Sequence, residues 1–298
     1  MFSPMAGLPR AMPANERAVE AGPGSLSRGA TSQPFLRWAG SKRKLIRRLS
    51  EYWSDKYARY VEPFAGSACL FFQLAPGRAI LGDINRELIE TYGQVRDNPL
   101  AVVSALARFK RGKGQYLRIR ALDSTTLPPA GSAARFIYLN RYCFNGLYRT
   151  NREGMFNVPY GGKKSGQLPS ELTLVQCAQL LRRAELVPGD FEAVLARTQP
   201  GDFVYLDPPF SVRGRRVFRE YGPSVFGQDD VERLRRWLTL LDQRGVAFLV
   251  TYADSAEARQ LARDYHVHAA AVQRNIAGFA KARARARELL ISNRPPSS

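Results

Sequence analysis

The sequence predicts an α/β fold in which a mainly parallel sheet is covered by helices on both faces. Short apolar runs alternate with amphipathic segments over residues 60–96 and again from about residue 185 onward. This alternation is typical of parallel sheets whose strands are joined by helices. The chain has 298 residues, 45% of them hydrophobic, so it can form one large domain or two of ordinary size.

The strands and helices of this sheet follow from the spacing of their apolar residues. Short continuous apolar runs predict strands, at 60–64, 78–81, 203–206 and 246–251. Helical apolar spacing predicts helices, at 68–74, 86–96 and 229–244. His266 and His268 alternate along the chain, which indicates one face of a further strand and not a catalytic pair.

The middle of the chain, residues 97–184, differs from both flanks. Helical spacing predicts three helices there, at 100–110, 133–143 and 171–183. Residues 145–164, rich in glycine, asparagine, arginine and tyrosine, lie between the last two. We interpret 97–184 as an inserted, largely helical domain with a basic recognition segment.

This insertion interrupts a sheet domain that is formed by residues 33–96 and 185–298. Residues 1–32 are rich in Gly, Pro, Ala and Ser without periodicity, which predicts a disordered leader.

The charge of the chain predicts a polyanionic partner. The net charge is +19 and the pI is near 10.3, which indicates nucleic acid more often than an anionic membrane surface. No apolar run approaches the length of a membrane span, and the N-terminus lacks the apolar stretch of a secretory signal. We therefore expect a cytoplasmic, nucleoid-associated protein.

The cysteines predict a reducing compartment. Cys69, Cys143 and Cys177 are few and widely spaced, and no pair has metal-ligand spacing. We expect buried small apolar residues, with neither a disulfide framework nor a zinc site.

Asp207-Pro208-Pro209-Phe210 predicts a pocket for a flat ring that bears an amine. The four residues follow a short apolar strand, so the carboxylate stands at the strand end. Asp207 can accept one N–H of the amine, the Pro208 carbonyl can accept the other, and Phe210 can stack on the ring. This favours transfer of an electrophilic group to the amine nitrogen. The alternative is a plain turn that closes the strand.

A glycine turn and an acid further upstream predict a site for a nucleoside-bearing cofactor. In residues 61–67 a strand turns through Gly66 toward a helix, so the backbone can approach a ligand closely. Asp83 ends the next strand, where an acid can hold ribose hydroxyls; its alternative role is to cap the following helix. Trp38 can pack against the cofactor and Lys42 can meet a carboxylate, or both are ordinary core and surface residues.

Together these segments resemble the Dam-type DNA adenine N6-methyltransferases, the D12 class (group alpha). The motifs that carry the resemblance lie at 35–42, 62–67, 83–85, 139–149, 156–161 and 207–210, followed by 274–276 and 288–290. Three positions depart from the family pattern. Phe210 stands where tyrosine is commoner, Ser41 where glycine is frequent and Arg37 where lysine is common.

The resemblance implies a Rossmann-like, S-adenosylmethionine-dependent methyltransferase sheet with an inserted, mostly helical target-recognition domain. It implies an adenine-specific, site-specific DNA methyltransferase (EC 2.1.1.72) that uses S-adenosylmethionine and double-stranded DNA, without a metal and as a monomer. The implied cofactor-contacting positions are Trp38, Lys42, Glu62, Phe64, Gly66, Asp83 and Asp207.

The implied chemistry needs no covalent enzyme intermediate. Adenine N6 is hidden in a duplex, so the base must be flipped out to reach Asp207, Pro208, Pro209 and Phe210. The methyl group of a sulfonium is already activated, so the protein mainly aligns and desolvates the reactants. None of the cysteines follows a proline, as the nucleophile of C5-cytosine enzymes usually does.

The implied recognition segment supplies the base contacts. Arg149 is the leading candidate to read a guanine, because this is the commonest specific contact of arginine. Asn145, Leu147 and Pro159 lie nearby, Phe144 can fill the gap left by the flipped base, and Arg37 can contact a base or a phosphate. A GATC-like target is implied by the resemblance alone. The alternative is a basic loop that contacts only phosphates.

Three competing functions remain open at this point. A DNA-binding protein without catalysis explains the charge but not the presence of both Asp207 and Asp83. Methylation of cytosine N4 usually goes with serine at the first position of the catalytic motif. Methylation of RNA or of protein glutamine usually goes with asparagine there.

Two basic segments have no assigned role. Lys281, Arg283, Arg285 and Arg287 alternate with alanine, so they can track phosphates or keep an edge strand soluble. Arg213, Arg215, Arg216 and Arg219 can hold a DNA backbone beside the pocket or form a solvated loop.

Overall fold

The computed structural model describes residues 32–151, 153–209, 226–273 and 285–296. The predictions for residues 1–31 of the leader, for Phe210, for the four arginines at 213–219, for the motif at 274–276, and for Lys281 and Arg283 concern residues outside these ranges. Within them, no helix is long and apolar enough to cross a membrane.

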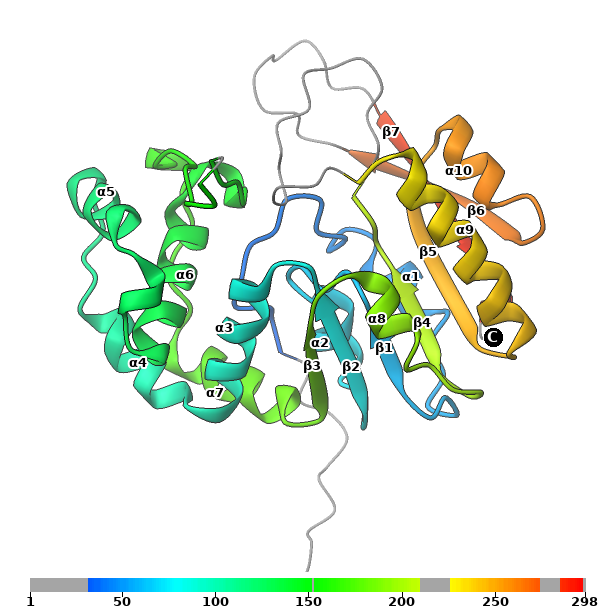
Figure 1. Ribbon diagram of the computed structural model, residues 1–298, viewed down its shortest axis with the longest axis horizontal. Coiled ribbons are helices and arrows are strands. Elements are labelled where there is room, and N and C mark those ends of the chain that lie inside the picture. Colours follow the sequence, from blue (N-terminus) through cyan, green and yellow to red (C-terminus); the bar gives the residue numbers. More distant parts are fainter. Residues whose placement is uncertain (1–31, 152, 210–225, 274–284, 297–298) are drawn as a thin grey trace, which may run out of the picture. The chain divides into compact units, whose positions relative to one another are not determined.

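A seven-stranded sheet runs through the described residues, in the order β3-β2-β1-β4-β5-β7-β6 (Figure 1). The first five strands in this order are parallel, and β7 is antiparallel to both of its neighbours. The strands are β1 (Tyr60–Glu62), β2 (Ala79–Asp83), β3 (Ala184–Pro188), β4 (Phe203–Leu206), β5 (Ala247–Ala253), β6 (His266–Gln273) and β7 (Arg285–Ser292).

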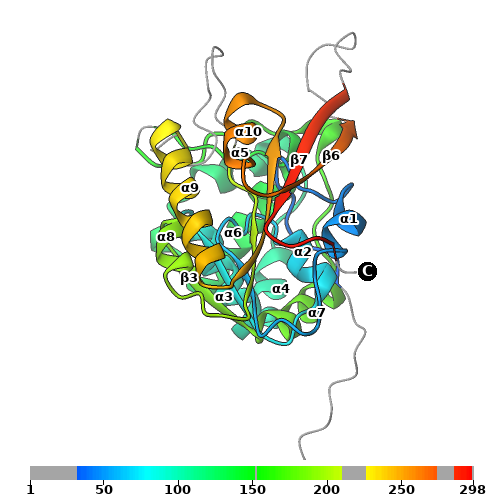
Figure 2. The same ribbon diagram turned by 90° about the vertical axis from the view of Figure 1, so that its right-hand side faces the viewer.

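Helices cover both faces of this sheet, as the two views show (Figures 1 and 2). The first face carries α1 (Ile46–Ser50), α2 (Cys69–Leu74), α3 (Arg86–Asp97) and α7 (Glu171–Leu181). Beyond them, α4 (Pro99–Ala107) packs on α3 and α7, α6 (Pro129–Tyr142) packs on α3 and α4, and α5 (Lys113–Ala121) packs on α6. The other face carries α8 (Phe191–Leu195), α9 (Gln228–Gln243) and α10 (Ala256–Leu261). Short 3₁₀ turns lie at Ser124–Thr126, Phe144–Gly146 and Gly162–Lys164.

Alternate residues of the central strands enter two separate apolar cores, because successive side chains point to opposite faces. In β4, Phe203 and Tyr205 join the core on the first face, whereas Val204 and Leu206 join the other. Both sets are almost fully buried, which explains why this strand is a continuous apolar run in the sequence.

The expected strands and helices are confirmed, with ends that differ by a few residues. The structure adds elements that were not predicted, among them α1, α5, α8, α10 and β3. His266 and His268 lie in β6, and the three cysteines are buried and free, as expected.

Three of the alternatives weighed from the sequence are wrong. Lys42 is not an ordinary surface residue, because it is buried, with 4% of its surface exposed. Asp83 does not cap α3, because Asn85 Oδ1 accepts the Leu88 N–H at 3.1 Å and so provides the cap. The strand that contains Arg285 and Arg287 is not an edge strand, because β7 lies between β5 and β6. The order of the strands along the chain does not indicate this position, because the last strand of the chain inserts between two earlier strands of the sheet.

The helices of the middle segment share an apolar core with the sheet. Val102 of α4 and Tyr138 of α6 belong to the same buried cluster as Phe35, Tyr60 and Phe203. The division into a catalytic domain and an inserted domain stays a prediction.

Candidate active site

The predicted site residues gather at the carboxyl ends of three neighbouring parallel strands. Glu62 ends β1, Asp83 ends β2, and Asp207 directly follows β4. These strands are adjacent in the sheet, so their ends meet at one edge, where ligands of open α/β sheets bind.

Asp207 is anchored through one oxygen of its carboxylate. Lys42 Nζ donates to Asp207 Oδ1 at 2.6 Å, and Thr251 Oγ1 donates to the same oxygen at 2.8 Å. The Lys42 side chain is 3% exposed, whereas that of Asp207 is 21% exposed. The carboxylate is therefore fixed from inside the protein and partly open outside. Pro208 beside it is buried and Pro209 is half-buried.

The glycine turn is held in place by Asp83. Gly66 N–H donates to Asp83 Oδ2 at 3.0 Å, Asn85 N–H donates to Oδ1 at 2.9 Å, and Tyr92 OH donates to the Gly66 carbonyl at 2.6 Å. Gly66 has φ of +47°, and a Cβ there would lie 2.8 Å from Trp38 Cδ1. Only glycine allows the turn to pass this close to the indole.

Burial changes the acidity of two carboxyl groups in the site. It raises the pKa of Asp83 to about 6, although its two backbone donors oppose the shift. It raises the pKa of Glu62 well above its ordinary value, and the nearby Asp207 and Asp83 act in the same direction. Tyr60 OH donates to Glu62 Oε2 at 2.9 Å and opposes the rise.

Phe64 packs against aromatic residues that were not predicted from the sequence. Its ring stacks on Phe191 at 5.3 Å between centroids and meets Phe226 edge-on at 6.0 Å. Ile84, between Asp83 and Asn85, is 54% exposed. The available signal was position, because Ile84 follows the end of β2 and Phe191 begins the helix after β3.

The predicted recognition residues lie on an irregular hairpin. Its two sides pair at Cys143 with Tyr160 and at Thr150 with Phe156, so the sides carry the predicted Phe144, Asn145, Leu147, Arg149 and Pro159. Phe144 N–H donates to the Pro159 carbonyl at 2.9 Å. Asn145 has φ of +56°.

Two predicted arginines are held beside this hairpin. Arg149 Nε donates to Asn157 Oδ1 at 2.7 Å, across the hairpin. Asn140 accepts from the backbone N–H of Arg37 at 2.8 Å and donates to its carbonyl at 2.6 Å. A Cβ on Gly146 would lie 2.8 Å from Arg37 Cβ, so Arg37 packs directly on the hairpin.

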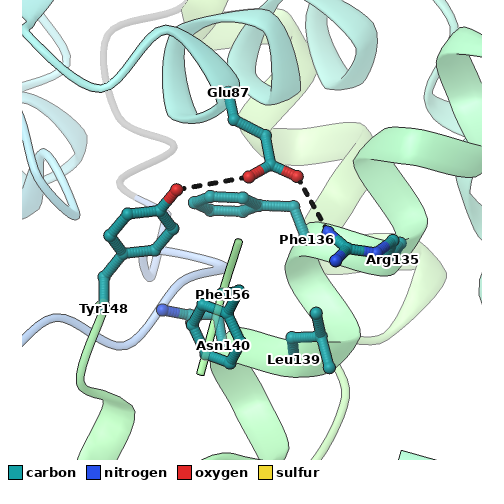
Figure 3. A pocket seen from close by; sticks show the side chains of 7 residues that line it. All are labelled: Glu87, Arg135, Phe136, Leu139, Asn140, Tyr148 and Phe156. Carbon is teal, nitrogen blue, oxygen red and sulfur yellow. Dashed lines mark hydrogen bonds and ion pairs between the residues drawn. The ribbon is translucent and has the colours of Figure 1, made fainter. Parts of the chain in front are cut away.

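Tyr148 joins the hairpin to Trp38 and to α3, and it was not predicted as a site residue. Its ring stacks on Trp38 with 6.0 Å between centroids and 17° between planes. Its hydroxyl donates to Glu87 Oε2 at 3.3 Å, and Arg135 NH1 donates to Glu87 Oε1 at 3.1 Å (Figure 3). Glu87 lies in the first turn of α3, so one small packed cluster connects the hairpin with the strand end that carries Asp83.

The sequence comparison decides the family. The D12 class N6 adenine-specific DNA methyltransferases match residues 38–276, most of the chain. The chain belongs to this class. As a D12 methyltransferase it is an adenine-specific DNA methyltransferase (EC 2.1.1.72) that uses S-adenosylmethionine as methyl donor.

Individual relatives match nearly along their whole length. The type II methyltransferase M1.LlaDCHI of Lactococcus lactis subsp. cremoris is 33% identical over 270 residues, 88% of this chain and 95% of the relative. The type II methyltransferase M.MjaIII of Methanocaldococcus jannaschii is 30% identical over 74% of this chain and 83% of the relative. A DNA adenine methylase of Vibrio cholerae is 30% identical over 86% of this D12 enzyme and 94% of the relative.

The strand ends of this D12 methyltransferase fit its methyl donor. The turn at Gly66 has no room for a side chain, so the backbone of the turn and the indole of Trp38 form one continuous surface. The Asp83 carboxylate stands beside this surface, where hydroxyls of a nucleoside can meet it. Lys42 Nζ forms ion pairs with the carboxylates of Asp207 and Glu288. Its contact with a carboxylate of the cofactor stays a prediction.

Proposed function

We propose that the enzyme methylates N6 of an adenine flipped out of double-stranded DNA, within a defined target sequence. The anchoring of Asp207 supports this most directly. Lys42 and Thr251 both donate to Oδ1, so we assign Oδ2 as acceptor for one N–H of the target amine. The Pro208 carbonyl is assigned to the other N–H, and Phe210 to the face of the base.

These two acceptors make the amine a better nucleophile, because they draw its lone pair out of conjugation with the ring. S-adenosylmethionine, when bound, supplies a methyl group activated by its sulfonium. The surplus proton of N6 leaves along the hydrogen bond to Asp207 after transfer. Asp83 holds the ribose hydroxyls, and Trp38, Glu62, Phe64 and Gly66 form the surrounding wall.

Methylation in living cells tests this function. Expression in a strain without adenine methylation is expected to give N6-methyladenine at one sequence motif, detected by modified-base sequencing. A GATC-like motif is our proposal for that target. Unmodified DNA, or N4-methylcytosine instead, would overturn the proposed function.

Arg149→Ala is expected to relax the sequence preference at one position of the target. Arg149 is held across the hairpin by Asn157, and loss of one arginine–guanine contact costs about 1–3 kcal/mol of discrimination. The measurement is the methylation rate on a set of duplexes that each carry one base-pair change. Arg235→Ala, at an exposed pair with Glu232, is the matched control. Uniformly slower methylation of all duplexes would instead identify Arg149 as a phosphate contact.

The affinity for cofactor is expected to depend on the ionisation of Asp83. Only the carboxylate form can accept from both ribose hydroxyls. Because the pKa of Asp83 is raised to about 6, affinity for S-adenosylhomocysteine should increase from about pH 5 to about pH 7 and then level off. Calorimetric titration across this range checks it, with Asp83→Asn expected to give a flat profile. Equal profiles for the two proteins would contradict the assignment.

In the protein without cofactor, ionisation of Asp83 lowers the stability of the fold, whereas it raises the affinity for cofactor. The ordinary pKa is 3.8 and the folded one about 6, so between these values the folded state binds more protons than the unfolded state. The contribution of Asp83 to stability is therefore present at low pH and lost as pH rises through this window. The difference in melting temperature between the native protein and Asp83→Asn measures it.

A further inference from the structure

Glu288 on β7 is a second acidic neighbour of Lys42. Lys42 Nζ lies 3.8 Å from Glu288 Oε2 and 2.6 Å from Asp207 Oδ1. The Glu288 side chain is 5% exposed and that of Lys42 is 3% exposed. A buried ammonium group is thus close to two carboxylates, one buried on β7 and one at the proposed site of methyl transfer, and it also donates to the Gly40 carbonyl at 3.0 Å.

The register of the sheet holds Glu288 in this place. Glu288 pairs with Ala253 of β5 and with Ala270 of β6, so strands hold its backbone on both sides. Thr251, the other donor to Asp207 Oδ1, pairs with Leu290 two residues further along β7. The pairing of β5 with β4 therefore places Thr251 beside Asp207, whereas the pairing of β7 with β5 and β6 places Glu288.

Stability alone does not account for a buried acid at this position. Charged groups lose their hydration when they are buried, and apolar residues in their place are often neutral or stabilising. The neighbouring residues Leu289, Leu290 and Ile291 show that the strand accommodates aliphatic side chains here. Glu288 is instead placed where its charge acts on the cation that anchors Asp207.

We propose that Glu288 is a positioning residue for methyl transfer, which acts on Asp207 through Lys42. With Glu288 present, the ammonium is attracted from both sides and stays on Oδ1 of Asp207. Without that second charge, the pull of Asp207 is no longer balanced by another carboxylate, so the ammonium, which also donates to the Gly40 carbonyl at 3.0 Å, can shift to bridge both oxygens of Asp207 and compete with the target amine for Oδ2. This inference rests on the proposed role of Asp207 as acceptor for the amine.

A double-mutant cycle with Lys42 tests the inference. Glu288→Gln, which keeps the shape, is expected to slow single-turnover methyl transfer roughly tenfold to a hundredfold, the scale of a small misplacement in an active site. Affinity for S-adenosylhomocysteine should stay within about twofold, since that ligand does not need Oδ2. In a Lys42→Met background, Glu288→Gln should cause no further loss, because residues that act as a unit are not additive.

Two further variants separate positioning from stability. Glu288→Leu removes the charge but suits the apolar strand, so it should fold and show the same loss of rate. Asp202→Asn breaks another buried ion pair, with Arg59 at the opposite end of β4, and should lower the melting temperature without changing the rate. An unchanged rate in both Glu288 variants, or losses that add to that of Lys42→Met, would overturn the inference. Full activity of Asp207→Ala would instead overturn the proposed function.

Discussion

Asp207→Ala is expected to slow methyl transfer by about a thousandfold, which is within the range for loss of a positioned polar group in an active site. The amine loses an acceptor and its lone pair stays conjugated with the ring. Single-turnover transfer of a labelled methyl group to duplex DNA measures this loss. Affinity for S-adenosylhomocysteine should change much less, because Asp83 and the turn at Gly66 carry most of the proposed cofactor contacts.

The alanine variant needs a control for folding, because it leaves Lys42 buried without its nearest partner, at 2.6 Å. Asp207→Asn keeps the shape and one acceptor oxygen, so it should fold more stably yet remain strongly impaired. If both variants are folded by circular dichroism and transfer methyl groups at the native rate, Asp207 is not the acceptor for the amine.

The sequence predicted the central strands and most of the long helices for a simple physical reason. Strands buried on both faces, such as Phe203–Leu206, are continuous apolar runs, and long helices such as α9 repeat their apolar residues at the helical period. The positions of Asp83 and Asp207 followed from the same logic. Once the strands were known to be parallel, their ends had to meet at one edge.

The contacts inside the site could not be predicted in this way, because they join residues far apart in the chain. Lys42 and Asp207 are 165 residues apart, and Tyr148 and Glu87 are 61 apart. Nothing local in the sequence indicates that Lys42 meets a protein carboxylate. The same reason applies to Glu288, since the place of β7 between β5 and β6 depends on the pairing of the whole sheet.

Gly66→Ala is expected to weaken binding of S-adenosylhomocysteine by at least about tenfold. An alanine at φ of +47° is in the left-handed region, which costs roughly 1–2 kcal/mol. Its Cβ would also lie 2.8 Å from Trp38 Cδ1, and the ring of Tyr148 stacks on this indole and restricts its movement. Either the turn or the indole must move, and both are parts of the proposed cofactor wall. Isothermal titration calorimetry measures the loss.

Comparison with Gly245→Ala separates the effect of the steric clash with Trp38 from the conformational cost of an alanine at positive φ. Gly245 also has a positive φ, +71°, but a Cβ there would meet nothing within 4 Å, and it lies in the turn between α9 and β5. This variant should lose about the same stability while its affinity for cofactor stays native. If both variants bind S-adenosylhomocysteine equally well, the close approach of Gly66 to Trp38 is not part of the cofactor site. A selective loss in Gly66→Ala would show that the indole and the turn bind the cofactor as one surface.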